Sequence, residues 1–319
     1  MELIEGVALS KLCDYSFGDQ SGQWGNIYTS FMEQANLLNL DFVSKVYEVQ
    51  KERDYMTLFI DNIRLYKRDI KEVKEDDKHY VNSLMADSNL LELCSHFSSM
   101  KFIIFTNLED TPIDEYIFNS IPENVLCISA VNAIAHGGKV IPAPYGIQRR
   151  MTPADDRIER LGSAMRAGVG PSMFKLLYVN HNDNSHEDRV GLKDMFRDQE
   201  WVNVDEQRVD YYNFLLNLAK HKFVLCPRGN AIDCHRNWEV LYMRRVPVMM
   251  TDTYLMDLFY DYPVLWVSGY EDITQDLLQL NNHLYEEAQE MDLDPLTLPT
   301  FFDNIVNVYT GVSETKLYG

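Results

Sequence analysis

Short, continuous apolar runs recur along the chain, and stretches with helical spacing of apolar residues lie between them. The runs occupy residues 56–60, 101–106 and 124–129 in the first half, and 174–179, 201–204, 223–226, 246–250 and 263–267 in the second. A run without polar alternation is typical of a parallel strand that is covered on both faces. The alternation of strands and helices predicts an α/β protein with parallel, doubly wound sheets.

The helices and the domain boundary are predicted from the same pattern. We expect helices at residues 24–38, 83–97, 187–196, 209–221, 234–245, 272–290 and 299–309. Proline and glycine are concentrated between residues 141 and 170, which is typical of a connection between domains. We therefore predict two α/β domains that face each other, at residues 1–165 and 166–298. The C-terminal segment, 299–319, is expected to return to the first domain.

The chain is strongly acidic, with 29 Lys and Arg against 49 Asp and Glu residues and a formal net charge of −20. This balance argues against nucleic acid as the main partner, because phosphate backbones bind to basic surfaces. It also disfavours attachment to anionic lipid. Basic residues can still gather in one cleft of an acidic protein, so a pocket for a small phosphate ligand stays open.

Cysteine usage and hydropathy indicate a soluble protein of a reducing compartment. The five cysteines are odd in number and widely spaced, which is not the pattern of a disulfide framework. No run approaches the roughly 20 apolar residues that cross a bilayer. Acidic residues stand at the N-terminus, where a signal peptide would be basic. We therefore expect a cytoplasmic protein without membrane insertion.

The segment 221–250, HKFVLCPRGNAIDCHRNWEVLYMRRVPVMM, contains the residues that point to a chemical function. A strand is expected to end at Cys226, because Pro227 has no N–H to donate to a neighbouring strand. Gly229 permits a close approach of the backbone to a ligand. A helix is expected to begin with Asp233 as its N-cap, and the backbone N–H groups at such a helix start can bind an anion.

Arg236 and Glu239 lie three positions apart, so both can occupy one face of this helix. Together with Arg228 they would supply two guanidinium groups, which match phosphate oxygens, and one carboxylate, which accepts hydrogen bonds from ribose hydroxyls. This combination indicates a nucleotide, and the lack of a Walker lysine loop favours a diphosphate leaving group over phosphoryl transfer. The alternative is an exposed Arg236–Glu239 ion pair worth about 0.3 kcal/mol.

The same segment resembles the signature of the exostosin-type glycosyltransferases. That signature consists of an apolar strand, Pro-Arg-Gly, an Arg and a Glu three apart on a helix, and a Val-Pro-Val strand. The matching residues here are Pro227, Arg228, Gly229, Arg236, Glu239 and Val246-Pro247-Val248, without a gap. The clear similarity covers residues 223–267. The rest of the second half is compatible, and the first half matches only in outline.

The resemblance implies a GT-B architecture, in which two facing Rossmann-like domains with parallel sheets hold the acceptor and the nucleotide sugar. It implies an inverting, metal-independent transfer from a UDP-sugar, of the UDP-xylose, UDP-galactose or UDP-glucuronate type, to a hydroxyl of an oligosaccharide or glycoprotein glycan. No cofactor is implied besides this co-substrate. Glu239 would bind the ribose, Arg228 and Arg236 would face the diphosphate or shape the donor loop, and Gly229 would let the backbone approach the donor. Family members are commonly anchored in the secretory pathway. We expect no anchor in this chain, and in that respect it resembles soluble members from bacteria and large viruses of algae.

An inverting transfer needs a base that takes the proton of the acceptor hydroxyl. The first domain should supply it, and the Gly-punctuated loop at 16–28 offers Asp19 as the first candidate. His136 is the second, because an imidazole can abstract a proton near neutral pH. In the second domain, Asn180 and Arg189 could reach the donor from the end of its first strand, with Arg189 adding charge against the diphosphate. The alternative for these residues is a solvated polar loop.

Other functions are less well supported by the sequence. Asp292 and Asp294 form an Asp-x-Asp pair, but their position between an acidic helix and a proline-rich turn predicts a surface site. Cys226, Cys234 and His235 lack the paired spacing of a zinc site, so no metal is expected. The missing dinucleotide fingerprint disfavours an epimerase or a dehydrogenase. A non-catalytic carbohydrate- or nucleotide-binding protein on the same scaffold stays open, because fold alone does not decide function.

Overall fold

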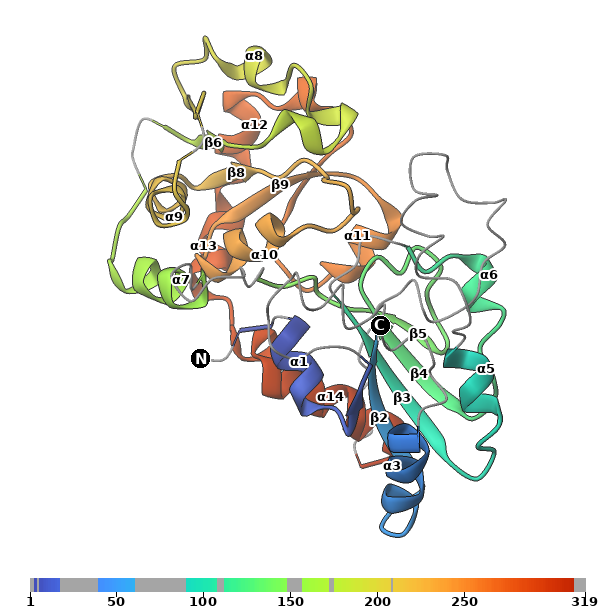
Figure 1. Ribbon diagram of the computed structural model, residues 1–319. Coiled ribbons are helices and arrows are strands. Elements are labelled where there is room, and N and C mark those ends of the chain that lie inside the picture. Colours follow the sequence, from blue (N-terminus) through green and yellow to red (C-terminus); the bar gives the residue numbers. More distant parts are fainter. Residues whose placement is uncertain are drawn as a thin grey trace. The chain divides into compact units, whose positions relative to one another are not determined.

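Figure 1 shows the computed structural model of the chain, which describes residues 3–4, 6–17, 40–60, 90–107, 112–147, 157–171, 175–207 and 209–312. Packing divides the chain into two compact units. The first unit comprises Met1–Tyr145, Arg149–Asp155 and Leu296–Gly319, and the second comprises Gly146–Gln148 and Asp156–Pro295. The predicted α/β class with parallel sheets is confirmed in both units.

The first unit contains a five-stranded parallel sheet with the order β1-β2-β3-β4-β5. Its strands are β1 (Tyr15–Ser16), β2 (Tyr55–Ile60), β3 (Lys101–Thr106), β4 (Val125–Ala130) and β5 (Val140–Pro142). The three apolar runs predicted in this half are therefore strands, and almost all of their residues are buried. β1 and β5 were not predicted: β1 has only two residues, and β5 ends at Pro142, within the proline- and glycine-rich stretch that was interpreted as a connection between domains.

The helices described in the first unit are α1 (Gly6–Leu12), α3 (Leu40–Gln50), α5 (Leu90–Ser95), α6 (Glu115–Phe118) and α14 (Leu298–Thr310). The C-terminal helix α14 packs against α1 and β4. Its Phe302 ring stacks on Phe105 of β3 with centroids 4.9 Å apart. The chain thus adds α14 to the first unit after the second unit is complete. The helix expected at 24–38 lies outside the described residues.

The second unit contains another five-stranded parallel sheet, with the order β10-β9-β8-β6-β7. Its strands are β6 (Leu177–Val179), β7 (Val202–Val204), β8 (Phe223–Leu225), β9 (Val246–Met250) and β10 (Leu265–Val267). All five apolar runs predicted in this half contain one of these strands. Most of the strand residues are buried, because helices cover the sheet and its apolar side chains form the core.

The helices of the second unit are α7 (Arg157–Arg166), α8 (Leu192–Phe196), α9 (Tyr211–Ala219), α10 (His235–Tyr242), α11 (Thr253–Leu258), α12 (Gln275–Leu280) and α13 (Asn282–Glu290). α7 packs against α9 and so belongs to the second unit, although the sequence placed it before the boundary at residue 165.

Two of the predicted helices are divided in the structure. The helix expected at 187–196 is a 3-10 turn, Glu187–Arg189, followed by α8. Gly191 separates them with a φ of 82°, a conformation that a helix cannot contain and that glycine adopts easily. The helix expected at 272–290 is a 3-10 turn, Tyr270–Asp272, followed by α12 and α13, which meet at Asn281.

Candidate functional site

The strand order of the second sheet indicates where this unit would bind a ligand. From β6 the chain forms β7 at one edge, and it then returns past β6 to build β8, β9 and β10 on the other side. Ligands of open α/β sheets bind at such a point of reversal, at the carboxyl ends of the two strands concerned. These ends are followed by the segments 180–191 and 226–234, which contain four of the six predicted donor-binding residues.

The start of α10 differs from the prediction by one residue. Cys234 is the N-cap, without a side-chain hydrogen bond, and Asp233 precedes it. The fully buried Asp233 carboxylate accepts hydrogen bonds from Asn237 Nδ2 at 2.9 Å and from Trp238 Nε1 at 2.7 Å. Trp238 also stacks on Phe259, with ring centroids 4.5 Å apart. Asp233 therefore anchors the first turn of α10 through the side chains of Asn237 and Trp238.

Arg189 holds the loop that follows β8. It is buried at the end of the 3-10 turn after β6, and burial lowers its pKa. Its Nε donates to the carbonyl of Arg228 at 2.7 Å, and its Nη2 donates to the carbonyl of Pro227 at 2.8 Å. A Cβ at Gly229 would lie 3.4 Å from Nη2, so Arg189 packs directly against this loop. Arg189 thus positions the backbone of the loop, a role that the sequence did not indicate, and its contact with a diphosphate stays a prediction.

We expect Arg189→Lys to lower the free energy of unfolding by about 2–3 kcal/mol. Lysine lacks the fork that serves both carbonyls, and buried acceptors would lose charge-assisted hydrogen bonds. Urea denaturation of both proteins at neutral pH measures the difference. Arg197→Lys is the matched control, because Arg197 is half exposed and pairs with Asp194 and Glu206 at the surface, where solvent screens the ion pairs and a much smaller loss is expected. Equal losses in the two variants would contradict the positioning role.

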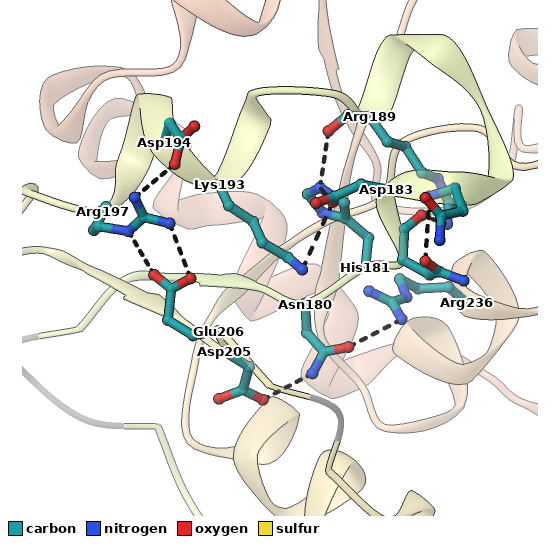
Figure 2. A network of polar contacts seen from close by, with 12 residues as sticks. Asn180, His181, Asp183, Arg189, Lys193, Asp194, Arg197, Asp205, Glu206 and Arg236 are labelled. Carbon is teal, nitrogen blue, oxygen red and sulfur yellow. Dashed lines mark hydrogen bonds and ion pairs between the residues drawn. The ribbon is translucent and has the colours of Figure 1, made fainter.

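Arg236 lies in the first turn of α10 and reaches the end of β6. Its Nη2 donates to Asn180 Oδ1 at 3.3 Å, as Figure 2 shows. Its guanidinium carbon lies 5.0 Å from the centroid of the Phe214 ring of α9, a cation–π contact. The structure therefore brings together two predicted residues, Asn180 and Arg236, that lie 56 positions apart in the sequence.

Two guanidinium nitrogens at this end of the sheet are buried without a hydrogen-bond partner. They are Nε of Arg228 and Nη1 of Arg236. A buried donor without a partner costs about 1–3 kcal/mol, so folded proteins contain few of them. These two buried cationic donors, both from the segment after β8, are therefore suited to an anionic ligand that accepts hydrogen bonds from them.

His181, next to Asn180, contributes a neutral ring to the same region. Burial and the charges of Arg236 and Arg189 lower its pKa to about 4. Its Nε2 lies 3.3 Å from the carbonyl of Arg189 and 3.2 Å from Asp183 Oδ1. The Arg189 carbonyl can only accept a hydrogen bond, so the proton of the neutral ring belongs on Nε2. The buried Nδ1, which has no partner, is then an acceptor that suits a ligand hydroxyl.

Glu239 is buried, with 4% of its surface exposed, and lies one turn after Arg236 on α10. Its Oε1 is 3.9 Å from Nη1 of Arg157 on α7. The guanidinium of Arg157 in turn lies 4.5 Å from the centroid of the Tyr211 ring. Arg236 and Glu239 therefore have different partners, and the alternative of an exposed ion pair between them is wrong.

The two candidate bases belong to the first unit. Asp19 lies outside the described residues. His136 is half-buried in the loop that joins β4 to β5, and its Nδ1 lies 2.9 Å from the carbonyl of Ala133. This loop leaves the carboxyl end of β4, which is the end of a parallel sheet where functional loops gather. The assignment of a base stays a prediction.

A separate cavity of about 440 Å³ in the second unit contains none of the predicted site residues. Acidic and aromatic side chains dominate its lining, which consists of Tyr260, Asp261, Tyr262, Pro263, Glu287, Met291, Asp292 and Pro295. Its carboxylates would repel a diphosphate, so we do not place the site there. Asp292 and Asp294 are exposed, as the sequence predicts.

Within the described ranges, no group of three or more His, Cys, Asp or Glu side chains could hold a metal ion. The five cysteines are free thiols. Every helix in the described part of the chain is too short or too polar to cross a membrane. Comparisons with protein-family models and with curated proteins found no match to this chain.

Three residues near the site were not singled out by the sequence. Asp205, directly after β7, accepts a hydrogen bond from Asn180. Phe214 lies under Arg236, and Arg157 faces Glu239. No motif marks them, because each reaches the site only through the strand order and through the packing of α7 and α9 beside α10. Helical spacing in α9 identifies Phe214 as a core residue but does not show that a guanidinium lies on its ring.

Proposed function

We propose that the protein is an inverting glycosyltransferase that uses a UDP-sugar as donor and a glycan hydroxyl as acceptor. The observation that carries the proposal is the pair of buried, unpartnered guanidinium donors of Arg228 and Arg236 at the reversal of the second sheet. A buried carboxylate, Glu239, lies one turn further along the same helix. Diphosphate and ribose are the neighbouring groups of a nucleotide sugar that such donors and such an acceptor recognise.

The proposed reaction is a single displacement at the anomeric carbon. The acceptor oxygen forms a bond to this carbon while the bond from the carbon to the diphosphate oxygen breaks, and the configuration inverts. The acceptor proton passes to a base, for which Asp19 and His136 are the candidates. Arg228 and Arg236 stabilise the negative charge that develops on the departing diphosphate, in a role that a metal ion has in other enzymes. The proposal includes a GT-B arrangement, with the acceptor bound by the first unit.

The test is incubation of the full chain with UDP-xylose, UDP-galactose and UDP-glucuronate, with and without glycan acceptors. We expect UDP release from one donor, faster with its acceptor, and unchanged rates in excess EDTA. Binding of UDP without turnover, at a stoichiometry near one, would support the non-catalytic binding protein instead. A rate that EDTA abolishes and manganese restores would contradict the metal-independent mechanism.

A further inference from the structure

A chain of hydrogen bonds leads from Asp205 through Asn180 to Arg236, as Figure 2 shows. Asp205 directly follows β7, Asn180 directly follows β6, and Arg236 lies in the helix after β8. Since β8, β6 and β7 are neighbours in the sheet, the strand order places these three residues in a row.

The donors and acceptors in this chain fix the orientation of the Asn180 amide. An ionised carboxylate only accepts hydrogen bonds. Asp205 Oδ2 accepts from Asn180 Nδ2 at 2.8 Å, so the amide nitrogen must face Asp205. The amide oxygen must then face the other way, where it accepts from Arg236 Nη2 at 3.3 Å. Reversing the amide would direct an N–H at the guanidinium and leave Asp205 without this donor.

Tyr178 keeps Asp205 in place. Its hydroxyl donates to Asp205 Oδ2 and lies 3.1 Å from Asn180 Nδ2. Burial and the Asp205 carboxylate both raise the pKa of Tyr178, so the phenol retains its proton and stays a donor. The backbone N–H of Asp205 also donates to the carbonyl of Val179 at 3.0 Å. Asp205 is therefore held at both its backbone and its side chain.

The guanidinium of Arg236 is held on a second side by the ring of Phe214. Nη2 points to Asn180, and Nη1 is the buried nitrogen without a partner. We propose that Asp205, acting through Asn180, is a positioning residue that turns Nη1 of Arg236 toward the phosphate groups of the ligand. This inference rests on the proposed function and adds a residue that does not itself touch the donor.

A double-mutant cycle tests the inference with the full chain. The probes are UDP, uridine and inorganic pyrophosphate, measured by calorimetry or by ligand-observed NMR. We expect Asp205→Ala to weaken the binding of UDP and of pyrophosphate about tenfold and to leave uridine binding unchanged. In an Arg236→Gln background the same change should cost less than about twofold, because the group that it positions is gone. Asn180→Ala should behave in the same way, and it keeps the test valid if Asp205→Ala fails to fold.

Glu206→Ala is the matched control. Glu206 is the next residue in the chain and forms a two-pronged ion pair with Arg197, at 2.6 and 2.9 Å, at the surface. Figure 2 shows that this pair lies apart from Arg236. The variant removes the same charge from the same segment, so we expect it to leave the binding of all three probes within about twofold of the unmodified protein.

The outcomes separate this inference from the proposed function. The positioning role would be overturned if Asp205→Ala weakened uridine and pyrophosphate binding equally, or if its loss of pyrophosphate affinity simply added to that of Arg236→Gln. Either result would leave the glycosyltransferase proposal standing. Coupled losses for pyrophosphate in a protein that shows no turnover of any UDP-sugar would support the positioning role and contradict the enzyme. An unmodified protein that binds neither UDP nor pyrophosphate would overturn both.

Discussion

Replacing Arg228 and Arg236 together by glutamine is expected to lower kcat for sugar transfer about 10³-fold. Both residues contribute a buried cationic N–H without a partner. Hydrogen-bond donors that are already in place stabilise the charge that develops in the transition state most strongly. Removing one such donor lowers kcat about 10²- to 10³-fold. We also expect weaker binding of UDP and pyrophosphate but unchanged binding of uridine, because in the proposed complex only the phosphates would contact the two arginines.

The control is a double variant with the same loss of charge at the surface, Arg197→Gln/Lys220→Gln. Both residues are exposed and belong to the same unit. Both double variants remove two positive charges from an acidic chain, so any increase in long-range repulsion of the anionic donor would be equal in the two, and salt would screen it. If kcat falls to a similar degree in both double variants, or if Arg228→Gln/Arg236→Gln retains the full transfer rate, the guanidinium groups of Arg228 and Arg236 do not act on the leaving group.

The sequence predicted the strand after which the site begins, because the local signals there agree. The run 223–226 is apolar, Pro227 cannot extend it, and the helical pattern resumes near residue 234, so β8, the loop and α10 follow each other as expected. Each of these elements is determined by residues close to it in the chain. The identity of the N-cap was wrong by one residue because Asp233 binds Asn237 and Trp238, and propensity alone does not distinguish these partners from backbone N–H groups.

The role of Arg189 could not be predicted from the sequence. It depends on a contact with carbonyls 38 and 39 residues away, and a backbone carbonyl has no residue-specific signal. Asp205 was missed for a similar reason. It follows a three-residue strand, and only the placement of β7 beside β6 brings its carboxylate to Asn180. Strand order in a parallel sheet results from packing of the whole unit, which periodicity does not encode.

The second large effect is expected from Glu239→Ala, which should abolish measurable transfer and weaken UDP binding about 100-fold. A buried carboxylate that accepts from ribose hydroxyls contributes charge-assisted hydrogen bonds, each worth about 1.5–3 kcal/mol. In contrast to the arginine variants, this change should weaken uridine and UDP binding equally and leave pyrophosphate binding intact. Titration of the three probes therefore tests whether Glu239 and the two arginines recognise different parts of one donor.

Arg157→Gln distinguishes ribose binding from a structural role of Glu239. The Glu239 carboxylate lies 3.9 Å from Arg157, so replacing either residue removes a favourable charge contact of the other in a buried setting, which is destabilising. If Glu239 only balances Arg157, both variants should lose stability and uridine affinity to a similar degree. If Glu239 binds the ribose, Arg157→Gln should lose about as much thermal stability as Glu239→Ala. It should nevertheless retain most of the uridine affinity, because the Glu239 carboxylate is still present. Glu239→Gln, which keeps the size of the side chain and one acceptor, should fall between Glu239→Ala and the unmodified protein in uridine affinity, and full transfer activity in it would exclude a ribose contact that depends on charge.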